Sequence, residues 1–191
     1  HDFGWIGVDL FLCLSAFLFA KLLSAEYIKQ GYINIKYFYI RRILRIWPLY
    51  IFFVGLMLVF TFYTNGWEQG IPVRLLGLVT FSDNLFSMTL GYNTAILYVA
   101  HLWTISFEEQ FYLVIPWGLG FLFQQSKKFA GIILVGLLFL GLGIRALFIY
   151  NQVQHPAIWV FPLTHFEPIF GGLIIGLGVF DKVLKNISSW I

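Results

Sequence analysis

Long apolar runs separated by short polar segments constrain the fold of this 191-residue chain more than any other feature. A helix needs about 20 apolar residues to cross a lipid bilayer. Only 11% of the residues are charged and 60% are hydrophobic, whereas about a quarter of a soluble domain is charged. We therefore predict an all-α fold, a polytopic transmembrane helix bundle with about five spans. These spans are expected at residues 8–28, 46–63, 107–123, 129–150 and 157–180.

The segment between residues 66 and 100 does not fit a further span. Its apolar piece, residues 73–81, is too short to cross a bilayer. A polar stretch, Ser82-Asp83-Asn84, follows it directly. We predict an interfacial or re-entrant helical segment at this place.

Basic residues indicate how the spans are oriented, because cytoplasmic loops carry an excess of Lys and Arg. The segment 29–45 is basic and contains no acidic residue, and shorter basic clusters lie at 127–128 and 182–185. If residues 73–81 do not cross the membrane, all three clusters fall on one side. We therefore predict a multi-pass membrane protein with these clusters on the cytoplasmic face.

Two adjacent carboxylates, Glu108 and Glu109, stand at the start of the uncharged run 111–123. Ionisable groups beside membrane-depth sequence are costly, and they tend to mark a substrate path or a buried pair. Ser106 and Glu109 have the Ser-x-x-Glu spacing of a helix capping box, which is one interpretation of these two residues.

The capping spacing does not account for Glu108. On a helix, Glu108 shares a face with Thr104 and Tyr112, which lie four residues before and after it. A carboxylate beside a hydroxyl and a phenol favours a buried polar network. A solvated charge at the membrane interface is the alternative interpretation.

Arg41, Arg42 and Arg45 stand just before the second apolar run. Arg42 and Arg45 are three residues apart, so they project from one face of a helix. An anchor for anionic lipid headgroups would account for basic residues here, but it does not require arginine over lysine. Guanidinium groups bind phosphate oxygens in a bidentate manner, which favours a phosphorylated cytoplasmic ligand.

Other ionisable residues lie within the predicted spans. An N-cap role is one interpretation of Asp9, at the start of the first span. Arg145, His165 and Glu167 lie inside the fourth and fifth spans, where mutual charge neutralisation and a functional site are the two interpretations. Ser15 and Ala16 are two adjacent residues with small side chains, which suits a close contact between helices.

Several stretches resemble one family. Residues 4–11 read Gly-Trp-Ile-Gly-Val-Asp-Leu-Phe, and residues 39–50 contain an Arg-x-x-Arg pattern. Residues 101–112 resemble the pattern His-x-Trp-Ser-x-Ser-x-Glu-Glu-x-Phe-Tyr, with Thr104 in place of a serine. Residues 164–172 resemble a later Thr-Arg-x-Asp…Gly motif. In order and spacing, these motifs resemble the acyltransferase 3 family of integral-membrane acyltransferases, similar to the O-antigen acetylases.

The resemblance implies an O-acyltransferase that moves an acyl group, expected to be acetyl, from a cytoplasmic acyl-coenzyme A to a hydroxyl. The implied acceptor is a cell-envelope sugar, a glycolipid or a similar lipid-linked molecule. The implied location is the bacterial inner membrane, with the lipid bilayer as a partner and with no metal and no nucleic acid. By motif, the catalytic candidates are Glu108, Ser106, Tyr112, His101 and Asp9, and the donor-binding candidates are Arg42, Arg45 and Arg41.

The chain also departs from the family pattern. His165 stands where the family often has arginine. The family's first span, which carries an arginine and a proposed catalytic histidine, is expected to be missing, as are its C-terminal spans. Residues 1–191 would then form a partial membrane acyltransferase domain. His1 is either the catalytic histidine or a residue of the connecting loop, and the short spacing to Asp9 favours the loop.

A transporter or flippase, whose buried charges line a path without performing chemistry, is the alternative function. Paired half-helices broken by Gly or Pro would favour it, and the sequence contains no such pairing. Acyl transfer instead needs a base for the hydroxyl proton, donors for the oxyanion and cations for the coenzyme A phosphates. The sequence leaves direct transfer and a covalent acyl-enzyme equally open.

Overall fold

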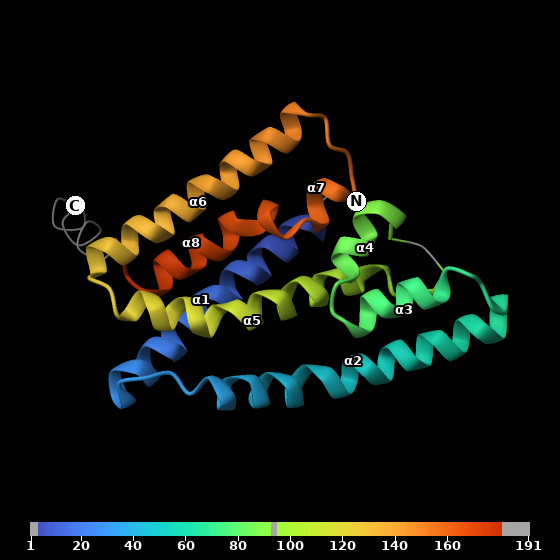
Figure 1. Cartoon of the computed structure of the whole chain (residues 1–191), viewed down its shortest axis with the longest axis horizontal. Helices are drawn as coiled ribbons and strands as arrows, with labels where there is room; N and C mark the ends of the chain where they lie inside the picture. Colours follow the sequence, from blue (N-terminus) through green and yellow to red (C-terminus); the bar gives the residue numbers. More distant parts are fainter. Residues whose placement is uncertain (1–3, 93–94, 181–191) are drawn as a thin grey trace. The chain divides into compact units, whose positions relative to one another are not determined.

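The computed structural model describes residues 4–92 and 95–180, and every regular element within them is helical (Figure 1). Short 3-10 turns precede α5 and α8, at Ala100–Leu102 and Pro162–His165. The α-helices are α1 Gly4–Gln30, α2 Ile35–Asn65, α3 Ile71–Val79, α4 Asp83–Leu90, α5 Trp103–Phe123, α6 Lys127–Tyr150, α7 Ala157–Val160 and α8 Phe166–Gly176.

Three of the described helices are long and apolar enough to cross a membrane. They cover Ile6–Gln30, Ile35–Asn65 and Lys127–Tyr150, and they match the spans predicted at 8–28, 46–63 and 129–150. The second helix begins eleven residues earlier than predicted, so it includes the basic segment with Arg41, Arg42 and Arg45. The predicted all-α fold with membrane-spanning helices is confirmed.

The other two predicted spans differ from the expectation in informative ways. Helix α5 covers the span predicted at 107–123, but it carries the polar stretch Glu108-Glu109-Gln110 and is not among the three helices that are long and apolar enough to cross a membrane. The run 157–180 is not one helix, because it divides into α7, a 3-10 turn and α8. Pro162 explains this break, since the residue before a proline is disfavoured in the α conformation. Phe161 is accordingly extended, with φ −72° and ψ 125°.

The segment between α2 and α5 forms short helices, as predicted. Helix α3 has nine residues and α4 has eight, so each is about 12–14 Å long, well short of a bilayer core. The two helices pack closely, because a Cβ on Gly77 of α3 would lie 2.9 Å from the ring of Phe86 on α4. Neither helix can cross a membrane alone.

The chain divides into two compact units. Within its described part, the first unit comprises residues 4–33, 115–147 and 163–180, and the second comprises 34–92, 95–114 and 148–162. The second unit holds an apolar core under α3. Its buried members are Tyr50, Val54, Ile71, Leu78, Ile96, Val99 and Leu102.

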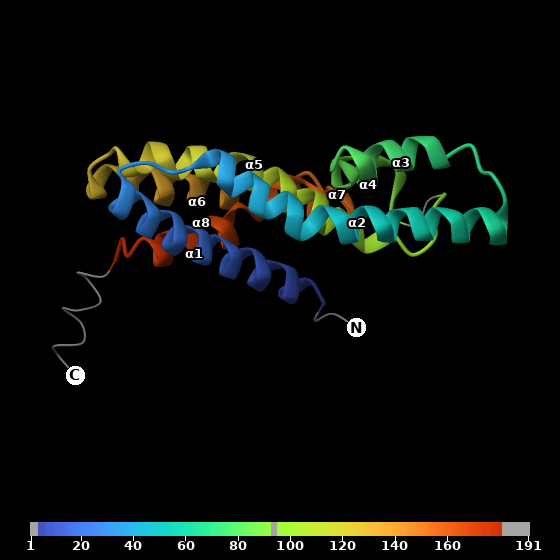
Figure 2. The ribbon, with the colours of Figure 1, turned by 90° about the horizontal axis from the view of Figure 1, so that it is seen from below.

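In the first unit, α1 and α8 lie side by side (Figures 1 and 2). Ala16 and Ala20 of α1 are fully buried. Gly172 and Gly176 of α8 approach them so closely that a Cβ on either glycine would lie within 3.0 Å of an alanine Cβ. Small residues four apart on each helix allow this approach. The predicted close helix contact at the small pair 15–16 is therefore confirmed for Ala16.

Candidate functional site

The start of α5 differs from the capping-box prediction. A 3-10 turn, Ala100–Leu102, leads directly into the helix, which begins at Trp103. Thr104 Oγ1 donates a hydrogen bond to the carbonyl of His101 at 2.9 Å. Ser106 therefore lies one turn inside the helix and cannot be its N-cap, so the capping box with Glu109 is wrong.

Glu108 and Tyr112 form the contact that helical spacing predicts. The Tyr112 hydroxyl donates to Glu108 Oε2 at 3.2 Å. Tyr112 is buried and Glu108 is half-buried. The Tyr112 hydroxyl therefore holds this oxygen of Glu108 in one orientation.

Arg42 of α2 joins this pair through the Tyr112 ring. Its guanidinium carbon lies 5.6 Å from the centre of the Tyr112 ring and 5.8 Å from that of Phe38. Contacts at this distance are cation–π interactions. Arg42 is half-buried, whereas Arg41 and Arg45 are exposed. The structure therefore brings together Arg42, Tyr112 and Glu108, and we call these three residues the α2–α5 cluster.

Glu109 lies on another side of α5. It is only 8% exposed, and its Oε2 accepts a hydrogen bond from Trp47 Nε1 at 3.2 Å. The Trp47 ring packs against Phe81, with ring centres 5.2 Å apart. Glu109 thus contacts α2 instead of closing the start of its own helix.

Buried polar residues support the same stretch of α5. Gln110 Nε2 donates to the carbonyl of Phe81 and to Asn84 Oδ1, both at 2.8 Å. Ser106 is fully buried, and its Oγ has no hydrogen-bond partner among the described residues. Because several polar contacts hold this part of α5, its carboxylates have a fixed orientation.

The remaining predicted residue of this motif, His101, lies one turn before the helix. Its side chain is exposed, and its ring meets Phe53 edge-on with ring centres 5.7 Å apart. Its catalytic role remains a prediction.

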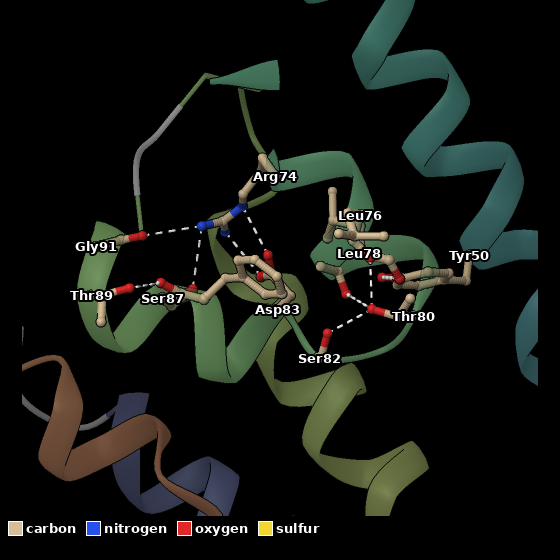
Figure 3. Close-up of polar contacts among 12 residues, drawn as sticks. Tyr50, Arg74, Leu76, Leu78, Thr80, Ser82, Asp83, Ser87, Thr89 and Gly91 are labelled. Carbon is tan, nitrogen blue, oxygen red and sulfur yellow. Dashed lines mark hydrogen bonds and ion pairs between the residues drawn. The ribbon is translucent and has the colours of Figure 1, made fainter. Parts of the chain in front are cut away.

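A buried ion pair holds α3 to α4 (Figure 3). Arg74 Nε lies 2.9 Å from Asp83 Oδ1, and a terminal Arg74 nitrogen donates to Asp83 Oδ2 at 3.0 Å. The other terminal nitrogen donates to Ser87 Oγ at 3.3 Å and to the carbonyl of Gly91 at 3.1 Å. Both charged side chains are 0% exposed. Burial raises the pKa of Asp83 to about 6, and the charge of Arg74 opposes that shift.

A second polar cluster lies in the other unit, at the start of α8. His165 Nδ1 is 3.0 Å from Asp9 Oδ1 of α1, and His165 is 1% exposed. Arg145 Nε of α6 lies 3.1 Å from both Glu167 Oε1 and the carbonyl of Thr164. Arg145 and Glu167 thus form the ion pair that the neutralisation interpretation predicts, whereas His165 contacts Asp9.

The N-cap interpretation of Asp9 is wrong. Helix α1 begins at Gly4, so Asp9 lies in its second turn. Asp9 instead pairs with His165, a residue that replaces the arginine usual in the family the motifs resemble. His1 and the basic cluster at 182–185 lie outside the described residues.

Comparison with known proteins agrees with the motifs. Residues 3–191 match the family described as "Acyltransferase domain". The chain belongs to this family.

Two curated relatives of this acyltransferase domain come from Staphylococcus aureus. "O-acetyltransferase OatA" of strain NCTC 8325 / PS 47 is 32% identical over 155 residues, which cover 76% of this chain and 26% of that protein. "Putative O-acetyltransferase SACOL0978" of strain COL is 30% identical over 192 residues, which cover 96% of this chain and 32% of that protein. This chain therefore spans about a third of these relatives or less. No solved structure matches it.

Sequence reasoning missed three polar residues of this acyltransferase domain. Trp47 stands five residues after Arg42, but nothing in the sequence indicates that its indole reaches Glu109. Arg74 is a lone charge in the apolar piece 73–81, and that isolation is a signal of a buried ion pair. Asp83 stands in the polar stretch 82–84, which by itself predicts no ion pair, although it is the partner of that arginine.

Proposed function

We propose that this chain is part of an integral-membrane O-acyltransferase that moves an acetyl group from acetyl-coenzyme A to a hydroxyl of a cell-envelope sugar or lipid-linked acceptor. The α2–α5 cluster is the observation that carries this proposal. Arg42 is a cation suited to binding phosphate, and Glu108 is a carboxylate suited to accepting a proton. Both contact Tyr112. Family membership and the names of the two relatives support it.

The donor would bind at the start of α2. Coenzyme A carries several phosphate oxygens, and guanidinium groups bind these in a bidentate manner. Arg41, Arg42 and Arg45 provide three such groups within two turns of helix. The exposed Arg41 and Arg45 fit an initial contact with the phosphates. The half-buried Arg42 fits a contact that is held in place by its aromatic neighbours.

The carboxylate of Glu108 would act on the acceptor. In acyl transfer, the hydroxyl oxygen forms a bond to the thioester carbonyl carbon, and the carbon–sulfur bond breaks. The hydroxyl proton must go to a base and finally to the sulfur of coenzyme A. Glu108 is the candidate base in the α2–α5 cluster, and Tyr112 fixes its orientation. An alternative is that Glu108 orients a histidine which accepts the proton.

The basic residues support a donor site on the cytoplasmic side of the membrane. The segment 29–45 is basic, and such segments are retained on the cytoplasmic side. Acetyl-coenzyme A is made in the cytoplasm, so a donor site at Arg42 and Arg45 would meet its substrate there. We accordingly propose the bacterial inner membrane as the location.

The proposal is tested with the full-length protein in lipid nanodiscs. Acetyl-coenzyme A affinity is measured by calorimetry. In parallel, the O-acetyl content of cell-envelope carbohydrate is measured, by acetate release in mild base, in cells with and without the gene. We expect saturable acetyl-coenzyme A binding and gene-dependent O-acetylation. A protein that neither binds the donor nor changes the acetyl content would contradict the proposal and favour the transporter interpretation.

A further inference from the structure

Glu109 carries a buried oxygen that the fold does not use. Trp47 Nε1 donates to Oε2. The second oxygen, Oε1, is also buried, yet it accepts no hydrogen bond from any residue in the described ranges 4–92 and 95–180. Because the whole side chain is 8% exposed, solvent access to this oxygen is small.

A buried carboxylate oxygen without a donor is costly. An ionised carboxyl group accepts hydrogen bonds at both oxygens, and leaving one unsatisfied in the interior destabilises the fold. A helix-capping role would have explained this residue, but Glu109 lies in the second turn of α5, past the positions that a cap uses. The fold alone therefore does not account for Glu109.

The surroundings hold Glu109 in one orientation. Its donor, the Trp47 indole, is itself packed against Phe81. Trp47 lies on α2 with Arg42, and Glu109 lies on α5 with Glu108, so Glu109 joins the same two helices as the α2–α5 cluster. A carboxylate with one oxygen fixed and the other unpartnered is preorganised to accept one further hydrogen bond.

We propose that Glu109 contacts the substrate: Oε1 accepts a hydrogen bond from an O–H or N–H group of a bound substrate while Trp47 holds Oε2. This inference rests on the proposed acyltransferase function. Two substrates of that reaction carry such groups. The acceptor offers its hydroxyl, and the pantetheine arm of coenzyme A offers amide N–H groups.

The test compares Glu109→Gln and Trp47→Phe in the full-length protein with Glu68→Gln as a matched control. Glu68 is an exposed carboxylate of the same unit, so its substitution makes the same chemical change away from the cluster. The readouts are the dissociation constant for acetyl-coenzyme A, the O-acetyl content of cell-envelope carbohydrate at matched protein levels, and the melting temperature. The Gln variant removes the charge, and its amide would present either a donor or a weaker acceptor at the Oε1 position.

We expect Glu109→Gln to reduce donor affinity or acetylation by about 10- to 100-fold, the range for a hydrogen bond to a charged group. Trp47→Phe should reduce the same quantity by a smaller factor, because the carboxylate remains but is less well held. Glu68→Gln should stay within about twofold. Weaker acetyl-coenzyme A binding would identify the pantetheine amides as the partner. Unchanged binding with reduced acetylation would identify the acceptor hydroxyl.

Unchanged affinity and acetylation in both variants, with an active wild-type protein, would overturn the inference and leave Glu109 as a structural residue. If Glu109→Gln does not fold, Trp47→Phe still decides the question, since it retains the charge and removes one hydrogen bond. A wild-type protein without donor binding or acetylation would instead refute the proposed function.

Discussion

His165 Nδ1 lies 3.0 Å from Asp9 Oδ1, although the two residues are 156 positions apart in the chain. The contact joins the second turn of α1 to the residue that precedes α8. His165 is buried, and the Asp9 side chain is 32% exposed. The adjacent residue, Thr164, accepts from Arg145 through its carbonyl, so two charge-bearing contacts meet at one turn of the chain.

This contact predicts a specific pattern of substitutions. We expect Asp9→Asn and His165→Ala each to lower the melting temperature of the full-length protein. The double variant should lose less stability than the two single variants added together. The difference is a coupling free energy of about 0.5–3 kcal/mol. His165→Arg should retain most of the stability, because an arginine also pairs with Asp9. Thermal unfolding in detergent measures all four.

Ser24→Ala is the control for the cost of changing α1, because Ser24 is a half-buried polar residue of the same helix as Asp9. Strict additivity of the two single variants would show that Asp9 and His165 do not interact in the folded protein.

The spans were predictable because hydrophobic length is a local property of the sequence. The runs at 8–28, 46–63 and 129–150 each became one helix. The run 157–180 did not, because its composition suits a span while Pro162 breaks the backbone hydrogen bonding within it. Average hydrophobicity does not detect a single proline.

The candidate site was predictable only where helical spacing decides the contact. Glu108 and Tyr112 are four residues apart, so an α-helix brings them together whatever the tertiary fold. The capping box failed because a 3-10 turn starts the helix earlier than the sequence pattern implies. The Asp9–His165 pair depends on how α1 packs against α8, and no local pattern encodes that.

The buried ion pair of Arg74 and Asp83 predicts a pH dependence of stability. The pKa of folded Asp83 is about 6, above the ordinary aspartate value of about 4. The folded protein therefore binds this proton more tightly than the unfolded chain. The contribution of Asp83 to stability is largest below about pH 4 and declines as the pH rises to about 6. Above that pH it is constant.

The measurement is the melting temperature of wild type and Asp83→Asn in the full-length protein between pH 4 and 7.5. Asn does not titrate. The melting temperature of wild type minus that of Asp83→Asn should therefore be largest near pH 4 and should fall as the pH rises to 6. A difference that grows in favour of wild type as the pH rises would show that Arg74 lowers the pKa of Asp83 below its ordinary value.

Arg42 and Arg45 should differ in their importance for the donor. Arg42 is half-buried over two aromatic rings, whereas Arg45 is exposed. Arg42→Lys keeps the charge but loses the planar fork and its packing. We expect it to raise the KM for acetyl-coenzyme A by about tenfold or more, and Arg45→Lys to raise it by less.

Lys36→Gln, at an exposed basic position of the same segment, controls for the loss of one charge. If both lysine variants keep the wild-type KM and rate, these arginines are membrane anchors only.

The orientation of the chain in the membrane gives an independent prediction. Residues 36 and 127 should lie on the same, cytoplasmic face, since the basic segments concentrate there. Single cysteines are introduced at these positions in a Cys13→Ser background, because Cys13 is the single native cysteine. A membrane-impermeant thiol reagent should label neither from outside intact cells, and both after permeabilisation. Labelling of residue 127 alone from outside would show that the arrangement is wrong.

Glu108 is the residue whose loss should affect turnover most. Its carboxylate is oriented by the Tyr112 hydroxyl, and a positioned acid–base group contributes about 100- to 10,000-fold to a rate. Glu108→Gln in the full-length protein should therefore reduce kcat by about 100-fold or more, with donor affinity and membrane insertion unchanged. Tyr112→Phe removes only the hydroxyl and keeps the ring beneath Arg42, so it should lower kcat by less and leave donor affinity intact.

Rates are compared at matched membrane levels, with Glu68→Gln as the control carboxylate. Near-normal turnover of Glu108→Gln would remove Glu108 from the reaction, and a larger loss in Tyr112→Phe than in Glu108→Gln would make the tyrosine hydroxyl the group that acts.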